Sequence, residues 1–334
     1  MPLARIGFIG CGRFATTAIY PSLRYAPIDL VAVCSLDAEQ AERVGRTFGA
    51  RRWYIDYHAM LDREELDGVI CITGSNHHRI ALDVLERGLC AYVEKPPAPD
   101  LEGAAALLEQ AGRTGRWVQV GFMKRFAPAY RRAWEIVRNA GEFGRPTHVY
   151  GKFSGDSWTS DPWDFVTGMT IHYADLLRFF LGEVEEVTAY TNTEGGSITI
   201  DAALRFACGA VGILSSGEHL NWYGHDERLE IAGTGTQVIV DNHVTVSYHP
   251  RQGLDNLQLT DEPVRTWTPG FTAIGEHCES LLLAGYIPEV RHFAECLLEG
   301  RTPEVTIADG YEAMRICRAL VQSGGKPVRV AAVG

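Results

Sequence analysis

The sequence predicts an α/β protein in two parts: an N-terminal doubly wound parallel sheet, then a C-terminal α/β part with a large, open, mostly antiparallel sheet. Two observations support this. Between residues 5 and 121, short apolar runs alternate with segments of helical spacing, which is typical of parallel strands joined by crossover helices. After residue 122, successive runs alternate apolar with polar residues, as in an antiparallel sheet with one covered face.

The N-terminal part contains five expected strands. Their apolar residues follow one another without alternation, which indicates strands buried on both faces. The stretches are RIGFIG (5–10), VAVCSL (31–36), GVICIT (68–73), CAYVEK (90–95) and WVQVGF (117–122). We therefore place a domain boundary at residue 122.

The C-terminal part opens with an expected helix at residues 127–139 and closes with two amphipathic helices within 288–323. Between them lie runs in which apolar and polar residues alternate, and each is an expected strand. These runs are residues 146–154, 183–192, 197–207, 210–220, 227–234 and 236–249.

Composition narrows the class of protein. The 334 residues are 46% hydrophobic and 22% charged, the balance of a globular protein. The net charge of −11 is spread along the chain, so nucleic acid is not an expected partner. No apolar run is long enough to span or anchor in a membrane. The eight cysteines show no disulfide or zinc spacing, which favours a reducing, cytoplasmic location.

A glycine loop follows the first expected strand, in the stretch IGFIGCGRFA. In the pattern Gly10-x-Gly12-x-x-Ala15, the first glycine permits a tight turn and the second lets the backbone approach a pyrophosphate. The alanine permits close helix packing. This context predicts a dinucleotide, and we expect Gly10, Gly12, Arg13, Phe14 and Ala15 to contact NAD or NADP. A purely structural glycine turn is the alternative.

The end of the second expected strand bears on the choice between NAD and NADP. A carboxylate there would bind the ribose 2′-hydroxyl, but the position holds Ser35, which accommodates a 2′-phosphate. Asp37 lies close by, yet its spacing to Gln40 also fits a helix capping box. The pattern favours NADP slightly, with three arginines as phosphate partners: Arg13, Arg43 and Arg46.

Glu94 and Lys95 stand at the carboxyl end of the strand in CAYVEKPPAPD, where open α/β sheets bind ligands. A partly desolvated lysine there can hydrogen-bond a substrate oxygen and favour negative charge on it. Two prolines follow, and a cis Lys95-Pro96 bond is compatible with the sequence. A solvated lysine in a turn is the alternative.

Six stretches in order along the chain resemble the Gfo/Idh/MocA oxidoreductases, the group of glucose-fructose oxidoreductase and inositol dehydrogenase. They are Gly10-Cys11-Gly12-Arg13, ITGSNHHRIALDVLERG (72–88), VEKPPAPD (93–100), QVGFMKRFAPAY (119–130), IHYADLLRFFLG (171–182) and PEVRHFAECLLEGRTPEVTIADGYEAMRI (288–316). The resemblance implies an NAD(P)-binding Rossmann domain at residues 1–122. It implies a substrate-binding and oligomerisation domain at 123–334 and hydride transfer to or from a sugar, inositol or related polyol.

The resemblance also implies site residues. Lys95 would lie by the reacting hydroxyl, His172 would be the general acid/base, and Asp175 would face the substrate. On the cofactor side we assign Thr73, Asn76, His77, Glu94 and Lys95. The chain departs from the family pattern at Gly168, where an aspartate is expected four residues before the histidine, and in the altered surroundings of Asn76 and His77.

His172 and Asp175 project from one face of a helix because they are three residues apart. Histidine exchanges a proton near neutral pH, which oxidation of an alcohol requires. A histidine satisfied within the core is the alternative. Asp164 or Asp175 could replace the missing aspartate, and Lys124 could reach the substrate. Adjacent His77 and His78 point opposite ways when extended, so no metal site is expected.

Four aromatic residues of the C-terminal part suit stacking on sugar rings or packing in the core: Trp158, Trp163, Trp222 and Tyr223. The hypothesis from sequence is thus a cytoplasmic NAD(P)-dependent dehydrogenase or reductase of a sugar or polyol. Its open sheet would be covered in a homodimer or homotetramer. Two alternatives stay open: a redox-assisted lyase or glycosidase that retains its cofactor, and a noncatalytic NAD(P)-binding sensor.

Overall fold

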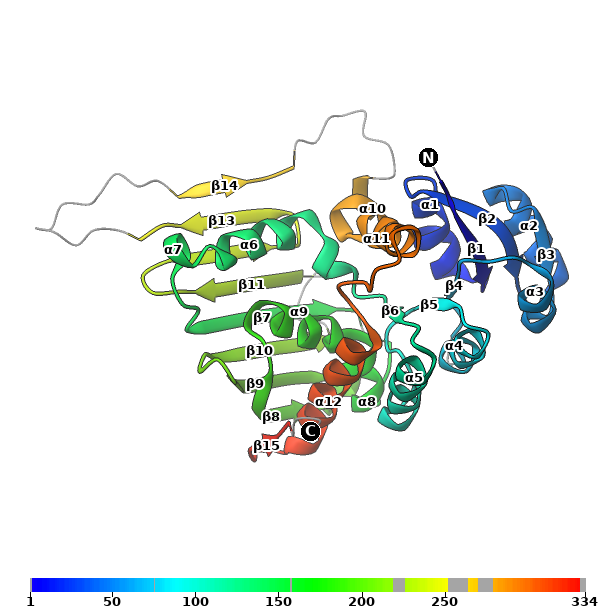
Figure 1. The fold of residues 1–334 in the computed structure, drawn as a ribbon. Helices are drawn as coiled ribbons and strands as arrows, with labels where there is room; N and C mark the ends of the chain where they lie inside the picture. The colour runs from blue at the N-terminus through cyan, green and yellow to red at the C-terminus, as the bar shows by residue number, and fades with distance from the viewer. Residues whose placement is uncertain are drawn as a thin grey trace, which may run out of the picture. The chain divides into compact units, whose positions relative to one another are not determined.

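Two compact units make up the chain (Figure 1). The computed structural model describes residues 2–74, 76–156, 158–218, 226–251, 264–269 and 279–330. The first unit runs to Phe126 and includes a later segment that ends at Glu312, and the second comprises the rest. Residues 279–312 therefore pack with the first unit, whereas the boundary expected at residue 122 places them with the second. The functional limits of the two domains stay a prediction.

The first unit is built on a six-stranded parallel sheet in the order β3-β2-β1-β4-β5-β6. The order reverses between β1 and β4, and ligands of such sheets bind beyond the carboxyl ends of the strands at that point. The strands are β1 (Ala4–Ile9), β2 (Ile28–Cys34), β3 (Arg52–Tyr54), β4 (Gly68–Cys71), β5 (Cys90–Val93) and β6 (Val118–Val120). The five expected strands are confirmed. The sixth, β3, was missed because none of its residues is buried, so it has no apolar run.

Helices cover this sheet, and each of three begins at an aspartate whose carboxylate accepts a backbone N–H: Asp37, Asp56 and Asp100. The helical elements are η1 (Ala15–Ile19), α1 (Tyr20–Leu23), α2 (Ala38–Phe48), α3 (Tyr57–Arg63), α4 (His77–Glu86), α5 (Leu101–Thr114), η2 (Met123–Phe126), α10 (Glu279–Ala284) and α11 (Tyr286–Glu299). Helix α11 joins the core through Phe293 and Leu297. A Cβ at Gly68 would lie 2.7 Å from Leu297 Cδ1, so a larger residue at the start of β4 would displace the Leu297 side chain.

The second unit contains a nine-stranded sheet in the order β14-β13-β12-β11-β7-β10-β9-β8-β15. Neighbouring strands are antiparallel except β7 and β10, which are parallel. The strands are β7 (His148–Gly155), β8 (Val184–Asn192), β9 (Thr199–Phe206), β10 (Val211–Glu218), β11 (Asp226–Ala232), β12 (Gln237–Asp241), β13 (Thr245–His249), β14 (Arg265–Trp267) and β15 (Val328–Arg329). The mostly antiparallel sheet is confirmed. The run expected at 236–249 is a hairpin, because Asn242 and His243 adopt left-handed φ angles of 48° and 49°.

Helices α6 and α9 lie against one face of this sheet (Figure 1). The remaining helical elements of the second half are α7 (Ala140–Phe143), α8 (Pro162–Phe165), η3 (Val166–Thr170), η4 (Glu194–Gly196) and α12 (Ile307–Ser323), with α6 at Pro128–Arg138 and α9 at Ile171–Leu181. On the other face, alternate residues of β9 and β10 are exposed, among them Val211 and Ile213. The homodimer or homotetramer expected to cover this face stays a prediction.

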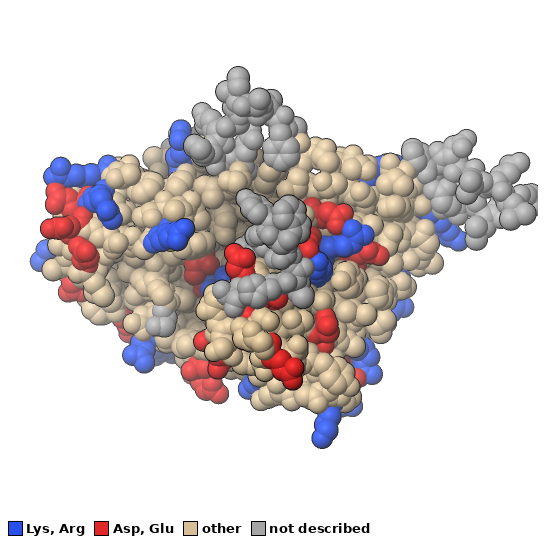
Figure 2. All heavy atoms as spheres, turned by 180° about the vertical axis from the view of Figure 1, so that it is seen from behind, with Lys and Arg blue, Asp and Glu red and all other residues tan. Residues whose placement is uncertain are grey.

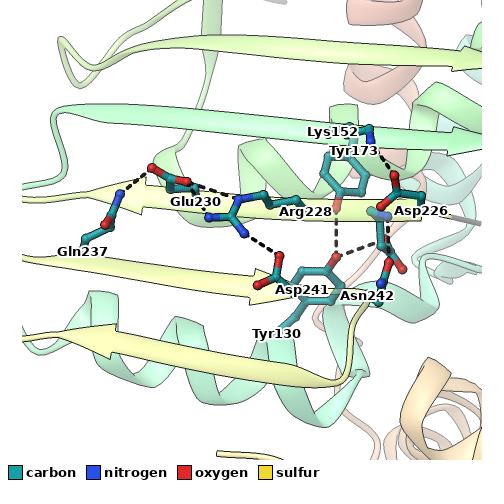
Figure 3. A network of polar contacts seen from close by, with 10 residues as sticks. Tyr130, Lys152, Tyr173, Asp226, Arg228, Glu230, Gln237, Asp241 and Asn242 are labelled. Carbon is teal, nitrogen blue, oxygen red and sulfur yellow. Dashed lines mark hydrogen bonds and ion pairs between the residues drawn. The ribbon is translucent and has the colours of Figure 1, made fainter. Parts of the chain in front are cut away.

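A buried carboxylate network fixes α9 on the sheet (Figure 3). The Tyr173 and Tyr130 hydroxyls lie 3.0 Å apart, and Tyr130 donates to Glu227 Oε2 at 3.0 Å. His243 Nδ1 lies against the other Glu227 oxygen. Burial, together with the Glu227 charge, raises the pKa of both phenols well above the ordinary value, so both remain donors. Because Tyr173 follows His172, this network sets the orientation of the helix that carries the candidate histidine.

Ion pairs continue from this network along β11 and β12 (Figure 3). Arg228 donates to Asp241 at 2.6 Å and to Glu230 at 3.1 Å, and Lys152 pairs with Asp226. These side chains are partly exposed, so each pair contributes about 1 kcal/mol or less. The buried tyrosines and Glu227 therefore carry more of the stabilisation than the ion pairs.

The surface shows no concentration of one charge on the face drawn in Figure 2, where basic and acidic side chains are interspersed. Within the described ranges, no helix is both long and apolar enough to cross a membrane. The cytoplasmic location stays a prediction.

Replacing Tyr130 with phenylalanine tests the buried network. The substitution removes the hydroxyl that is hydrogen-bonded to both Tyr173 and Glu227, and it leaves a buried carboxylate with one donor fewer. We expect a loss of about 1–3 kcal/mol in the free energy of unfolding, measured by urea denaturation. Tyr190→Phe, at a tyrosine 70% exposed, is the matched control and should change stability by less than about 0.5 kcal/mol. Equal stability of the two variants would contradict the network's role.

Candidate active site

The glycine loop after β1 makes the close approach that the sequence predicts. Gly10 has a φ of 113°, and a Cβ there would lie 2.0 Å from the Ile72 carbonyl oxygen at the end of β4. The Gly10 N–H donates to Cys34 O at 2.8 Å, and the Tyr20 hydroxyl donates to Gly10 O at 3.2 Å. Any other residue at position 10 would be strained and would clash with β4. At Gly12, in contrast, an added Cβ would meet nothing within 4 Å, so its backbone faces open space.

These residues fit a dinucleotide. Arg13 and Phe14 are exposed at the open side of the loop, and Ala15 is buried beneath it. The Thr73 hydroxyl, at the end of β4, is buried and has no hydrogen-bond partner among the described residues. A buried hydroxyl without a partner is costly, and a ligand group can satisfy it. The crevice between β1 and β4 therefore provides open glycine backbone, a helix start and an unused hydroxyl.

The residues expected to meet the ribose, after β2, form internal hydrogen bonds. The Asp37 carboxylate accepts the Gln40 N–H at 3.1 Å, which confirms the expected helix cap. The Gln40 side chain does not complete the capping box, because its Oε1 accepts from Ser35 Oγ at 2.8 Å. Arg46 pairs with Glu42 and lies over the Trp53 ring, while Arg43 is exposed. Arg43 and Arg13 are thus the better placed of the three expected phosphate partners.

His77 joins the loop after β4 to the chain after β5. Its Nδ1 lies 2.8 Å from the carbonyl oxygens of Thr73 and Gly74, and its Nε2 lies 2.7 Å from Pro96 O. Both ring nitrogens are therefore used within the protein. The neighbouring Asn76 is exposed. Cofactor contacts of Asn76 and His77 stay predictions, and any contact of His77 must use its ring carbons or backbone.

Lys95 lies in a desolvated setting beside Glu94. The Lys95-Pro96 peptide is cis, and the Lys95 N–H donates to Glu94 Oε2 at 3.2 Å. Burial lowers the pKa of Lys95; the Glu94 charge opposes this, and the Lys124 cation adds to it. Burial raises the pKa of Glu94 from 4.5 to about 7, although Lys95 opposes the rise. Lys95 is therefore not the fully solvated turn residue of the alternative interpretation.

Tyr92 and Glu289, which form a buried hydrogen-bonded group with Glu94, were not predicted from the sequence. The Tyr92 hydroxyl lies 2.9 Å from Glu289 Oε2 and 3.3 Å from Glu94 Oε1, and Glu289 is fully buried. A phenol has one proton and can satisfy one carboxylate at a time, which favours a proton on Glu94. A Cβ at Gly121 would lie 2.8 Å from Glu94 Oε1, so position 121 must stay small. No sequence signal could link Glu289 to β5, because 197 residues separate it from Tyr92.

In the second unit, His172 and Asp175 are both buried on α9, at 7% and 1% exposure. The Phe153 ring of β7 meets the His172 ring edge to face, with centroids 6.0 Å apart. The structure thus brings His172 and Asp175 onto one helix turn, as expected. Asp164, in α8, is exposed, and its N–H donates to Asp161 at 3.1 Å. Lys124 is buried and belongs to the first unit.

The aromatic residues named from the sequence divide into two groups. Trp158 is exposed. Trp163 is partly buried, and its backbone N–H donates to Asp161 Oδ1 at 2.8 Å. Trp222 and Tyr223 lie outside the described residues. Among the residues that the structure describes, no group of three or more His, Cys, Asp or Glu side chains could hold a metal ion.

Comparison with known proteins matches both parts of the chain. Residues 4–122 match the model of an oxidoreductase family with an NAD-binding Rossmann fold, and residues 130–239 match the GFO/IDH/MocA C-terminal domain. A relative named scyllo-inositol 2-dehydrogenase (NAD(+)), from Bacillus subtilis, is 30% identical over 87% of this chain and 85% of its own length. The chain belongs to the Gfo/Idh/MocA oxidoreductase family.

Solved structures share the fold of this chain. A dehydrogenase from Chromobacterium violaceum matches with a TM-score of 0.87 and 23% identity, over 97% of this chain and 96% of that one. Levoglucosan dehydrogenase in complex with NADH and levoglucosan matches with a TM-score of 0.83 and 22% identity, over 99% and 100%. The expected Rossmann sheet and the second, mostly antiparallel domain are thereby confirmed.

Replacing Gly10 or Gly12 with alanine should distinguish the glycine needed for folding from the glycine needed for cofactor binding. We expect Gly10→Ala to lower the free energy of unfolding by at least about 2 kcal/mol, because its φ and the Ile72 carbonyl exclude a Cβ. Gly12→Ala should stay within about 0.5 kcal/mol of the parent and weaken NADH binding about tenfold. Urea denaturation without cofactor and fluorescence titration with NADH measure the two effects. If Gly12→Ala binds NADH with the affinity of the parent, the proposal that this loop contacts the cofactor is wrong.

The raised pKa of Glu94 predicts a pH dependence of stability. Between pH 4.5 and about 7 the unfolded chain releases the Glu94 proton while the folded chain retains it. Raising the pH through this window should therefore lower the stability of the wild type relative to Glu94→Gln, by up to about 3 kcal/mol. Urea denaturation across this pH range measures the difference. Glu39→Gln, at an exposed glutamate, is the control and should show the wild-type slope.

Proposed function

We propose that this member of the Gfo/Idh/MocA family is an NAD-dependent dehydrogenase of a cyclic polyol or sugar. Lys95 carries the proposal. It follows the carboxyl end of β5, an internal parallel strand. Burial lowers its pKa, and Glu94 and Lys124 lie close enough to influence its charge. A lysine in this setting is suited to hydrogen-bond an alcohol or carbonyl oxygen whose charge changes during reaction.

His172 and Asp175 are the residues proposed for proton transfer and for positioning. When bound, the nicotinamide cofactor provides the acceptor or donor of hydride. Oxidation of an alcohol also releases a proton, and the His172 imidazole is proposed to take it from the reacting hydroxyl. Asp175, one helix turn further on and buried, is proposed to orient the substrate or His172. Asp164, by its exposure, is the weaker candidate for a substrate contact.

The substrate class is supported by the relatives. The relative at 30% identity is named for scyllo-inositol, and another, from Paraburkholderia graminis, is named D-apiose dehydrogenase and is 24% identical over 93% of this chain. Both names describe oxidation of a polyhydroxylated compound. Neither the retained-cofactor lyase or glycosidase nor the noncatalytic sensor gains support from these names.

The choice of NAD follows the relative named for NAD(+). The sequence favours NADP slightly because Ser35 replaces an acidic residue, and the exposed Arg13 and Arg43 could pair with a 2′-phosphate. The internal hydrogen bond from Ser35 to Gln40 removes the serine hydroxyl proton from that role. The ratio of kcat/KM for NAD and NADP measures the preference directly.

Substitution of the two proposed catalytic residues tests the function. The protein is assayed with scyllo-inositol, myo-inositol, D-glucose and D-xylose and with NAD or NADP, and the absorbance of reduced nicotinamide is followed. We expect turnover on a ring polyol with NAD, and a loss of about 100-fold or more in kcat for His172→Ala and for Lys95→Ala. NADH affinity of His172→Ala should remain within a few-fold of the parent.

Matched controls are His58→Ala and Lys326→Ala, at an exposed histidine and an exposed lysine, and both should keep parental kcat. If turnover survives His172→Ala and Lys95→Ala within a few-fold, the assigned chemistry is wrong. If the wild type reduces neither cofactor with any of the substrates, the proposed substrate class is wrong.

A further inference from the structure

Trp158 lies so close to Gly168 that a side chain at position 168 would have to displace the indole ring. An ideal Cβ at Gly168 would lie 2.3 Å from Cζ2 and 2.4 Å from Cη2 of the indole. The φ of Gly168 is not left-handed, so its backbone does not require glycine. Within a helical segment, glycine costs about 1 kcal/mol relative to alanine. Space for the Trp158 ring is therefore the physical reason for glycine at this position.

A buried carboxylate holds the Trp158 backbone in place. The Trp158 N–H donates to Glu218 Oε1 at 3.2 Å, and the Ile198 N–H donates to Glu218 Oε2 at 2.9 Å. Glu218, the last residue of β10, is 1% exposed. The segment that carries Trp158 is thus tied to the end of β10, an internal strand of the sheet, through a hydrogen bond to a carboxylate.

Trp158 nevertheless remains 56% exposed. Its ring atoms Cζ2 and Cη2 lie over Gly168, and more than half of the surface of the residue is left to solvent. Apolar surface left in water forgoes about 25 cal/mol for each Å² that could be buried. A tryptophan that is held in position and yet exposed is typical of the aromatic walls that line ligand sites.

The helix position that Trp158 covers lies one turn before the candidate acid/base. Gly168 and His172 are four residues apart in the continuous helical run of η3 and α9, so they are neighbours on the helix surface. The ring that fills the space above Gly168 is therefore one helix turn from His172. From the sheet side, Phe153 of β7 faces His172, and β7 ends at Gly155, three residues before Trp158.

We propose that Trp158 is a specificity-determining residue whose indole face stacks on the C–H face of a ring-shaped substrate, with Gly168 making room for it. This inference rests on the proposed function, which it narrows. A six-membered ring with equatorial hydroxyls directs its axial C–H bonds to both faces, and such a face packs well on an aromatic ring. An axial hydroxyl on that face would press against indole carbon without a hydrogen-bond partner. The preferred substrates are therefore cyclitols and pyranoses whose hydroxyls are all equatorial.

Three variants test the stack: Trp158→Ala, Trp158→Phe and Gly168→Ala. With the best of scyllo-inositol, D-glucose and D-xylose and saturating NAD, we expect Trp158→Ala to raise KM about tenfold and to change kcat by less than about threefold. Trp158→Phe should recover part of the loss because a smaller ring remains. Gly168→Ala should reproduce the rise in KM, since its methyl group displaces the indole.

A double variant makes the test specific. If Gly168→Ala acts through the indole, the Trp158→Ala Gly168→Ala protein should have the KM of Trp158→Ala alone, whereas independent effects would multiply. Loss of selectivity for D-glucose over D-galactose, which differ by one axial hydroxyl, should accompany the loss of the ring. Thermal melting and NADH titration establish that each variant is folded and binds cofactor.

The outcomes separate the two proposals. An active wild type whose KM is unchanged in Trp158→Ala and Trp158→Phe would overturn the stacking role and leave the dehydrogenase function standing. Variants that lose kcat or stability while KM stays unaltered would also overturn the stacking role. A wild type that binds NADH but oxidises none of the ring polyols would overturn the proposed function and, with it, this inference.

Discussion

Carboxylates taken out of water must be given hydrogen-bond donors, and this requirement organises both units around the candidate residues. Glu227 receives Tyr130 and His243, and through Tyr130 it orients the helix of His172. Glu218 receives two backbone N–H groups, one of them from Trp158. Each buried charge thus fixes a segment that carries a residue with a proposed role. The first unit follows the same rule, because Tyr92 lies between Glu289 and Glu94.

Burial has a second consequence at the end of β5. It disfavours charge on both Lys95 and Glu94, so the pKa of the lysine falls and the pKa of the carboxyl rises. Their mutual attraction opposes both changes. A pair held in this balance can change its protonation when a cofactor or substrate alters the local field, and such groups concentrate at functional sites. The contact between His77 and the Pro96 carbonyl ties the segment that follows the pair to the loop after β4.

Much of this could be read from the sequence because it depends on neighbours along the chain. Uninterrupted apolar runs identified the five parallel strands that contain buried residues, and the glycine spacing identified the loop that approaches Ile72. The cap at Asp37 and the helix that bears His172 and Asp175 follow from spacings of three residues. The features that were missed join distant parts of the chain. Helix α11 completes the first unit although it lies more than 150 residues beyond β6, and the three-residue strand β3 has no apolar pattern of its own.

The sequence by itself determined the elements, the dinucleotide loop and the family, because periodicity and short motifs encode local backbone geometry. Only the tertiary structure decided how deeply those residues are buried and which charged groups lie beside them. Desolvation of Lys95 and Glu94 depends on everything packed around them. The interpretation of Gly168 also depended on the fold. The sequence shows only that an expected aspartate is absent at this position. The structure shows that the Trp158 ring lies over it, a contact that forms only when residues distant along the chain pack together.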